Sequence, residues 1–427
     1  MSETAGTIVR SEFDGRKLLL LCAALGLTAS MNATMVYGLG SFIVPLKSAF
    51  GWSRGDVSLA STMLTLGVFL FGPVVGRLGD RFGAAAVGSI SLVSYSAMVV
   101  VMSLTVQTLP GLWIFYFMIA LCGVGSTPIV LLRPIAAGFD KQRGLALGIA
   151  LTGAGLSGFW VPNVVTAVIA NYGWQAGYWA MAAAAMLAAP IVWFGFRPSE
   201  KREKLAIIDG APKAGMTFRE ARNTRAFAMV SVLAFSMALG IGGMVVHLNP
   251  LFQDYGASAA TAAGLASLIG ISSAFSRLLT GISLDRFPAR LVSVVVICLG
   301  TLGIALIWLG GLRFGLPGVI LIGLLLGAEL DLLAYLTSRL FGQRAFGAIY
   351  GWTYSLFSFG FGLGPLLMGH LHDQFGSYDN ALLANVSLLL GSAAVAFGLS
   401  GRSEMEGRFD TGHIASNRAH FEERKSM

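Results

Sequence analysis

Four charged side chains interrupt otherwise apolar stretches of the sequence, and these residues are the best placed to do chemistry. They are Arg133, Arg277, Glu329 and Asp331. A charge at the centre of a membrane helix costs roughly 2.5–3.5 kcal/mol on insertion scales, so it is retained mainly where it pairs, lines an aqueous cavity or binds a substrate. The four charges also cancel, as they would in a structural network. We expect a site for a charged small molecule, with a structural ion-pair network as the alternative.

The two arginines differ in depth. Arg277 precedes Asp285, which lies in a predicted loop, by eight residues, and this places it about 12 Å inside its helix. Its guanidinium stays charged and offers a planar fork of donors that matches a carboxylate. We interpret Arg277 as the contact for an organic anion, with a permanent ion pair to Glu329 or Asp331 as the alternative. Arg133 lies near a predicted loop that its long side chain can reach, so substrate contact and a positional role both stay open.

Glu329 and Asp331 lie two residues apart in the middle of one apolar run. Two residues correspond to about 200° around a helix, so the two acids cannot share a face. One can therefore line a cavity while the other meets a neighbouring helix. A carboxyl group that alternates between a buried position and a nearby cation can take up and release a proton. Both acids are candidates for coupling, and the alternative is that both form structural pairs with the arginines.

Further polar side chains lie inside the apolar stretches and could orient a bound molecule. Hydroxyl and amide groups can hydrogen-bond to a carboxylate, and histidine titrates near neutral pH. The candidates of this kind are Asn32, Tyr37, His247, Tyr350 and Tyr354. His247 lies toward the predicted outer end of its helix, where contact with water alone is the alternative.

The sequence does not offer the residue patterns of an enzyme. It contains no Walker A motif, no metal-ligand cluster and no Ser/His/Asp arrangement. Residues 153–158 fit the pattern G-x-G-x-x-G, but no strand precedes them and no acid follows about 20 residues later. Close helix packing explains these glycines better than dinucleotide binding. We expect no enzymatic activity, no metal and no cofactor.

The elements that carry these residues are predicted to be membrane helices. The chain has 427 residues, of which 55% are hydrophobic and 12% charged. Apolar runs of about 20 residues recur from residue 18 to residue 400, and about 20 residues are needed to cross a hydrocarbon core about 30 Å thick. We predict an all-α integral membrane protein with twelve transmembrane helices.

The longest polar interruption divides these helices into two groups of six. The expected organisation is an N-terminal tail (1–17), a six-helix bundle (18–197), a central loop (198–224), a second six-helix bundle (225–400) and a C-terminal tail (401–427). Lysine and arginine concentrate in segments on one side, which predicts that both tails and the central loop lie in the cytoplasm. The membrane is expected to be a bacterial-type inner membrane. This distribution accounts for the net charge of +8, so nucleic-acid binding is not expected.

The two halves repeat each other. Residues 76–82 (GRLGDRF) and 281–287 (GISLDRF) are separated by the same offset of 205 residues throughout. A second echo links 139–144 (FDKQRG) with 341–347 (FGQRAFG), and each is followed by a small residue four positions on, which permits close helix packing. Duplication of this size favours a transporter with a site between its halves near the membrane centre. We expect pseudo-symmetric bundles that work as a monomer in the lipid bilayer.

The first of these repeats resembles a family motif. Gly76-x-Leu78-x-Asp80-Arg81-x-Gly83 is similar to the loop motif between the second and third helices of the major facilitator superfamily. The resemblance implies that the Asp and Arg of this motif help to latch the outward-open state from the cytoplasmic side. The predicted gating residues are Gly76, Asp80 and Arg81, with Asp285 and Arg286 in the second copy. The sequence departs from the motif at residues 84–86, which are alanines where basic residues are usual.

A narrower resemblance is to the branch of monocarboxylate porters and oxalate–formate antiporters. Residues 50–54 (FGWSR), 143–148 (RGLALG) and 362–365 (GLGP) are similar to that branch, and 274–277 (AFSR) is similar to its eighth-helix segment, where an arginine meets the substrate carboxylate. Two departures stand out. Ser273 occupies the position where many monocarboxylate porters carry an aspartate, and no lysine lies deep in the first or eleventh predicted helix.

These observations predict a secondary active transporter. It would move a small organic anion, a carboxylate, by alternating access, coupled either to protons or to a counter-transported anion. Two other functions stay open. One is an efflux transporter for neutral or cationic amphiphiles, in which the acids receive the cation. The other is a membrane sensor that does not transport, although no ligand-binding or kinase-like domain is evident in the sequence.

Overall fold

The structure is a computed structural model that describes residues 12–208 and 214–399. The predicted C-terminal tail (401–427), most of the N-terminal tail (1–17) and part of the central loop lie outside the described residues. Within these ranges the chain is helical, apart from one isolated antiparallel bridge between Gly215 and Gly342. The all-α prediction is therefore confirmed for the part of the chain that the structure describes.

The first half contains six long helices, two of which are interrupted, between α1 and α2 and from α5 to α7. Its elements are α1 (Lys17–Thr28), α2 (Met31–Phe50), α3 (Arg54–Phe82), α4 (Ala84–Thr105), α5 (Leu109–Gly123), η1 (Val124–Ser126), α6 (Pro128–Leu131), α7 (Arg133–Gly138), α8 (Arg143–Tyr172) and α9 (Trp174–Ile208). Pro128 and Pro134 lie in the first turns of α6 and α7, where the missing N–H of proline is tolerated. The predicted loop at 198–224 instead begins as a continuation of α9.

The second half contains six unbroken long helices, one short α-helix and one 3-10 turn. Its elements are α10 (Phe218–Ala221), α11 (Arg225–Asp254), α12 (Ala259–Arg286), α13 (Ala289–Gly310), η2 (Gly311–Phe314), α14 (Gly315–Phe341), α15 (Phe346–Phe375) and α16 (Asp379–Phe397). Hydroxyl side chains cap two of the long helices, because Thr224 accepts from the backbone of Phe227 and Ser258 from that of Thr261.

Ten segments of the described chain are long and apolar enough to cross a membrane. One of them, 289–341, contains both α13 and α14 joined by η2, and α15 is not among the ten. Counting α13 and α14 separately and including α15 gives the twelve long helices that the sequence predicts. α15 is less apolar because it carries polar residues, among them Thr353, Ser355 and Ser358, which are buried between other helices.

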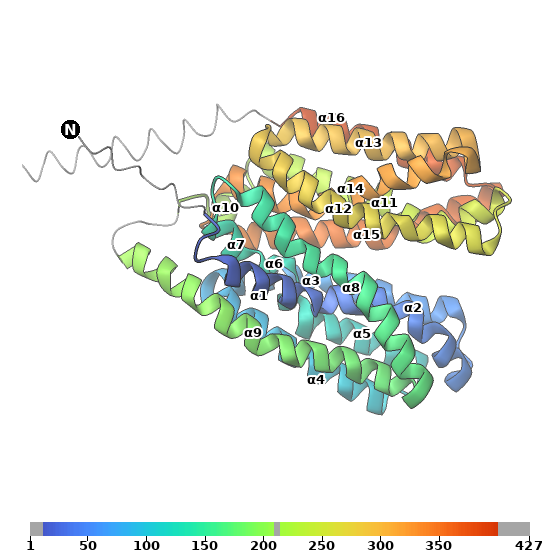
Figure 1. Ribbon diagram of the computed structural model, residues 1–427, viewed down its shortest axis with the longest axis horizontal. Coiled ribbons are helices and arrows are strands. Elements are labelled where there is room, and N and C mark those ends of the chain that lie inside the picture. Colours follow the sequence, from blue (N-terminus) through green and yellow to red (C-terminus); the bar gives the residue numbers. More distant parts are fainter. Residues whose placement is uncertain (1–11, 209–213, 400–427) are drawn as a thin grey trace, which may run out of the picture.

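The two halves lie side by side. In Figure 1, α1–α9 (blue to green) form one group and α11–α16 (yellow to red) the other, and the groups approach each other most closely toward the end that carries α10. Two pairs of helices make the main contacts between them, α3 with α15 and α8 with α12. Glycines allow these approaches: a Cβ on Gly76 would overlap the backbone of Gly347, and one on Gly281 would lie 2.6 Å from the carbonyl oxygen of Gly144.

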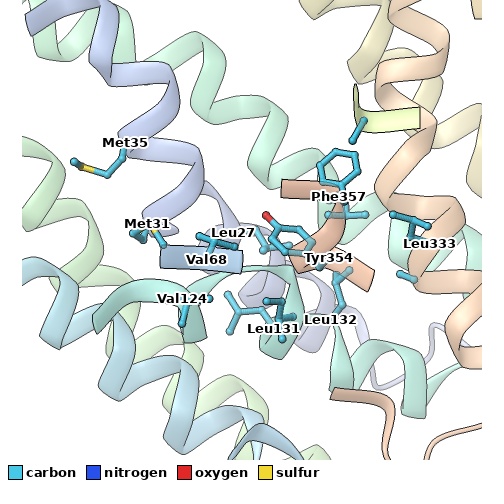
Figure 2. Close-up of a cluster of buried hydrophobic side chains, with 14 of the residues drawn as sticks. Leu27, Met31, Met35, Val68, Val124, Leu131, Leu132, Leu333, Tyr354 and Phe357 are labelled. Carbon is cyan, nitrogen blue, oxygen red and sulfur yellow. The ribbon is translucent and has the colours of Figure 1, made fainter. Parts of the chain in front are cut away.

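A hydrophobic core runs across the boundary between the halves. Figure 2 shows buried side chains from the first half, including Leu27 and Val68, near Leu333 of α14 and Tyr354 and Phe357 of α15. These residues belong to one continuous cluster of buried side chains. The halves therefore pack as one core in this conformation, and polar residues at their boundary are held in apolar surroundings.

The segment before α10 is joined to the second half. The backbone N–H of Met216 donates to the carbonyl of Phe341 at 2.8 Å, and that of Gln343 donates to Ala214 at 2.9 Å. The bridge of Gly215 and Gly342 lies between these bonds. α10 follows directly, and its capping box is closed by Thr217 and Glu220.

Candidate functional site

Arg277 of α12 pairs with Asp331 of α14 inside the protein. The Nη1 group of Arg277 donates to Asp331 Oδ2 at 3.3 Å, and the two side chains are 9% and 0% exposed. The pairing that the sequence offers as an alternative is therefore present in this conformation. It is incomplete, because Arg277 Nε and Asp331 Oδ1 are buried and have no hydrogen-bond partner among the described residues.

This pair faces α8 of the first half. A Cβ on Gly155 would lie 4.0 Å from Arg277 Nε, and one on Gly148 would lie 3.5 Å from Asp331 Oδ1. The ion pair therefore sits at the boundary between the halves. Gly155 belongs to the glycine run whose pattern resembles a dinucleotide motif. Close helix contact explains the first glycine of that run, because a Cβ on Gly153 would overlap the backbone of Ala24 in α1.

Glu329 is more isolated than Asp331. It is fully buried, and neither of its carboxyl oxygens has a hydrogen-bond partner within residues 12–208 and 214–399. Asp331 reaches Arg277, whereas Glu329, about 200° away around the same helix, does not bond to it. A polar group without partners in an apolar interior is costly. The two acids thus occupy different environments, as their spacing predicts.

Tyrosines from α15 approach the same boundary. The side-chain amide of Asn32, in α2, donates to the hydroxyl of Tyr354 at 3.3 Å, so this bond joins the two halves. The rings of Tyr350 and Tyr354 are 6.0 Å apart, and the buried hydroxyl of Tyr350 has no partner in the described part of the chain. Both hydroxyls are close enough to interact electrostatically with Arg277.

The first turn of α2 is positioned by the break that precedes it. The backbone N–H of Met31 lacks a helical acceptor and donates instead to Ser126 Oγ at 3.0 Å. Asn32 follows and reaches Tyr354. One turn later, Tyr37 is 43% exposed, and its ring lies 3.3 Å from where a Cβ of Gly158 would be. The helix break therefore places two of the predicted polar candidates on the side that faces α8 and α15.

His247 lies apart from this group. Its Nδ1 is 3.0 Å from the hydroxyl of Tyr378 and its Nε2 is 3.0 Å from the carbonyl oxygen of Pro365. A neutral ring satisfies both contacts when Nε2–H donates to the carbonyl and Nδ1 accepts from the hydroxyl. All of these residues belong to the second half, so the structure does not bring His247 to Arg277.

Arg133 also lies elsewhere, at the end of the protein predicted to be cytoplasmic. Its Nε donates to Asp80 Oδ1 at 3.3 Å and its Nη2 pairs with Glu203 Oε1 at 3.2 Å. Asp80 in turn accepts from the backbone N–H groups of Gly347 and Ala348, each at 2.9 Å. These N–H groups begin α15, where the positive end of a helix dipole favours a carboxylate.

The second copy of the motif makes the equivalent contact, from the second half to the first. Asp285, near the end of α12, accepts from the backbone N–H groups of Gly144 and Leu145 at 2.6 and 2.8 Å. These groups begin α8. We call the Asp80 and Asp285 contacts the two latches, because each ties one half to a helix start of the other. The arginines after them are exposed: Arg81 lies over the ring of Phe82 at 5.1 Å, and Arg286 ends α12.

A third contact between the halves involves residues that the sequence does not single out as a site. Asp140 pairs with Arg339 of α14 at 2.8 Å and with Arg143 at 3.2 Å. The carboxylate of Glu12 accepts from three consecutive backbone N–H groups, at residues 140–142. Burial of Glu12 opposes its ionisation, but these donors outweigh it and hold the pKa of Glu12 below its ordinary value. The only signal in the sequence is the repeated FDKQRG segment.

Comparison with known proteins gives the family. The model of the Major Facilitator Superfamily matches residues 25–365. Human Monocarboxylate transporter 11 is 25% identical over 407 residues, which cover 90% of this chain and 83% of the human protein. The Agnestins efflux protein AgnL12 of Paecilomyces divaricatus is 23% identical over 398 residues, covering 90% of this chain and 88% of that protein.

Solved structures agree on the fold. The proton:xylose symporter XylE, bound to 6-bromo-6-deoxy-D-glucose, has a TM-score of 0.70 at 12% identity and covers 92% of this chain and 97% of its own. The fucose:proton symporter FucP of E. coli has a TM-score of 0.66 at 15% identity, with coverage of 91% and 98%. With a family model matched over most of its length and this fold, the chain belongs to the Major Facilitator Superfamily and is a multi-pass membrane transporter rather than an enzyme.

Proposed function

We propose that this protein is a secondary active transporter that carries a small organic anion, a carboxylate, by alternating access of its two halves. The observation that carries the proposal is the incomplete bonding of Arg277. Its guanidinium is buried at the boundary of the halves, uses Nη1 for Asp331 and leaves Nε without a partner among the described residues. A guanidinium with free donors in a low-dielectric site is suited to hold a carboxylate.

Neighbouring polar groups support this assignment. The Tyr350 hydroxyl, which has no partner in the described ranges, and the Asn32–Tyr354 bond lie close to the arginine. In the proposed complex, the carboxylate binds Arg277 and these groups orient it, because buried hydroxyl and amide groups gain most from a specific partner. The aromatic ring of Tyr37 would form one side of the binding site. The names of the relatives, Monocarboxylate transporters 10, 11 and 13 among them, favour the same class of cargo.

Asp331 supplies a route to coupling. Arg277 is one cation, and a bound carboxylate would place a second anion beside Asp331. Electrostatic repulsion in a buried site then favours protonation of Asp331 when the substrate binds. Glu329, which is buried nearby on the same helix, is the second candidate for the transferred proton. Exchange of one anion for another is the alternative, since a second substrate can replace the first on Arg277 without a proton.

The two latches supply the gate. Both join the halves at the end predicted to be cytoplasmic, so this conformation is closed there, and opening toward the cytoplasm requires Asp80 and Asp285 to leave the helix starts that they contact. We assign Gly76 to the same gate because its contact with Gly347 requires the absence of a side chain. The exposed Arg81 and Arg286 would act only in other conformations. We propose residues 18–197 and 225–400 as the two moving units, with both termini in the cytoplasm of an inner-membrane protein.

The test is a binding and transport assay with Arg277→Lys. Lysine keeps the charge but loses the fork, so thermal stabilisation of the purified protein by mono-, di- and aromatic carboxylates should fall, and uptake into proteoliposomes should fall with it. Arg219→Lys, at an exposed position of α10, is the matched control and should behave as the native protein. Full transport by the Arg277→Lys variant would overturn the assignment of Arg277.

A second candidate is efflux of neutral or cationic amphiphiles. Two observations favour it: the Agnestins efflux protein is among the relatives, and the buried acid Glu329 has no hydrogen-bond partner in the part of the chain that the structure describes. The same stabilisation assay separates the candidates, because lipophilic cations would then stabilise the protein more than carboxylates. Glu329→Gln would abolish that stabilisation and leave any effect of carboxylates in place.

A further inference from the structure

A cavity of about 350 Å³ lies in the first half, away from the Arg277 site. It is bounded by the residues before and at the start of α1, by the end of α7 and by α9 near Pro198 and Arg202. All three segments belong to one half, so the cavity does not depend on how the halves are placed. It lies at the end predicted to be cytoplasmic, where α9 continues beyond the expected membrane span.

Two arginines line this cavity. Arg16 is held in place, because its Nη1 donates to the carbonyl of Glu12 at 3.5 Å and its guanidinium lies 5.4 Å from the ring centre of Phe139. Arg202 is exposed and has no ion-pair partner within the described ranges. Glu203 also lines the cavity, but it is paired with Arg133 at 3.2 Å. The lining therefore offers two positive charges that no acid of the lining neutralises.

The remaining wall is apolar and faces the bilayer. Leu18 and Leu19 line one side, and Gly138 lies opposite with no side chain. Leu18 is 63% exposed at the start of a membrane-spanning segment, so this side is open to lipid. Lys17 and Lys201 are exposed beside the two arginines and extend the positive charge along the same edge.

We propose that this cavity binds an anionic phospholipid of the cytoplasmic leaflet. Its phosphate lies between Arg16 and Arg202, and its acyl chain follows Leu18 and Leu19. A basic pocket between membrane helices on the cytoplasmic side is the kind of site that holds anionic headgroups. Free phosphate would use the arginines but not the apolar wall, and a zwitterionic lipid would bring its own cationic group beside the two arginines, which repel it. The transported substrate is excluded as occupant because the cavity touches one half only.

The proposed lipid site lies next to residues that contact the Asp80 latch. Glu203 lines the cavity and bonds to Arg133, which bonds to Asp80, one of the two latches. A phosphate on Arg202 would lie beside Glu203 and so change the electrostatic field at the Glu203–Arg133 pair. The lipid site therefore adjoins the gate without forming part of it.

The test measures the melting temperature of the full-length protein in neutral detergent as phosphatidylglycerol, phosphatidylcholine or inorganic phosphate is added. Phosphatidylglycerol should raise the melting temperature in a saturable way, and the other two should not. The double variant Arg16→Gln/Arg202→Gln should lower the apparent affinity for phosphatidylglycerol about 25-fold, because each basic residue near a membrane surface contributes a factor of about five. Lys201→Gln, which is adjacent but does not line the cavity, is the control and should leave the apparent affinity close to that of the native protein.

A second variant tests the apolar part of the cavity and keeps both arginines. A Cβ on Gly138 would lie 3.8 Å from Leu19 Cδ2 with no closer neighbour, so Gly138→Leu extends into the cavity without a backbone clash. It should abolish stabilisation by phosphatidylglycerol even if the double variant fails to fold. Equal stabilisation by phosphatidylcholine, an equal effect of inorganic phosphate, or undiminished lipid binding by Gly138→Leu would each overturn the proposal.

Discussion

Arg277 and Asp331 are joined by a single hydrogen bond of 3.3 Å, although each side chain can make several. A buried ion pair repays the cost of desolvation only when its remaining donors and acceptors are also satisfied. Here Arg277 Nε and Asp331 Oδ1 are not satisfied within the described residues. The two side chains are therefore better suited to exchange hydrogen-bond partners with a substrate than to stabilise the fold.

Asp331→Asn should uncouple transport from a pH gradient. The amide keeps the shape of the side chain and can still accept from Arg277, but it cannot take up a proton when a carboxylate binds. We expect substrate binding to persist and its pH dependence to disappear, as measured by carboxylate-induced stabilisation between pH 5 and pH 8. Glu329→Gln is the matched variant, since Glu329 does not contact Arg277. If both variants retain the native pH dependence of transport, proton coupling through α14 is wrong.

Asp80→Asn and Asp285→Asn should each weaken closure at the predicted cytoplasmic end. A carboxylate at a helix start contributes about 0.3–1 kcal/mol, and up to ~2 kcal/mol where it is partly buried. The effect of Asp80→Asn should be the larger, because it also leaves Arg133 without one of its two acids. The measurement is labelling of cysteines introduced near Gly144 and Gly347 by a thiol reagent applied from the cytoplasmic side.

Asp56→Asn provides the control for these two variants. Asp56 closes the capping box with Ser53 at the opposite end of α3, so it removes a carboxylate from a helix start without touching a latch. Its labelling should match that of the native protein. Equal labelling in the Asp80 and Asp285 variants would show that these contacts do not hold the closed conformation.

Gly148→Ala should destabilise the contact between α8 and α12. The added methyl group would lie 2.6 Å from the carbonyl oxygen of Arg277, so the helices must separate. Gly391→Ala, in α16, meets nothing within 4 Å and should instead stabilise the protein by about 0.5–1 kcal/mol through helix propensity. Melting temperatures of the two purified variants should therefore shift in opposite directions, and a fall in both would contradict the packing of α8 on α12.

Glu12 should make stability depend on pH in the acid range. Its pKa is lowered in the folded protein, so its stabilising effect is present above the ordinary value of 4.5 and is lost as pH falls through the folded value. Glu12→Gln keeps one acceptor oxygen and should flatten this part of the curve. The check is the melting temperature from pH 7 down to pH 3. Asp14→Asn is the control: it also removes a carboxylate from this segment, but the backbone N–H groups of residues 140–142 donate to Glu12 and keep their acceptor in this variant. An identical acid limb in both variants would contradict the capping role of Glu12.

The sequence predicts the architecture well because the apolar composition and length of a segment are enough to identify a membrane helix. The lengths of the apolar segments predict the twelve long helices, and the repeated GRLGDRF and GISLDRF segments indicate two equivalent contacts. The spacing of Glu329 and Asp331 also predicts their different surroundings. These are properties of one helix at a time, or of two segments that resemble each other.

What the sequence does not predict depends on contacts between distant residues. The repeated FDKQRG segment marks the region of Asp140 but does not indicate that Arg339 is its partner, and Glu12 lies in a stretch that is predicted as a polar tail. The choice of Asp331 rather than Glu329 as the partner of Arg277 is decided by how α12 and α14 face each other. The sequence also does not predict the extension of α9 to Ile208, because residues 198–208 carry the charges and the proline typical of a loop.

The backbone bonds that join residues 214–216 to the loop between α14 and α15 determine which half α10 accompanies. Any rocking of one half against the other that preserves these bonds carries α10 with the second half. Arg77 of α3 also places its guanidinium 5.0 Å from the ring centre of Phe218, so α10 touches the first half through side chains while backbone bonds hold it to the second. A protein or antibody fragment bound to α10 would therefore act mainly on the second half.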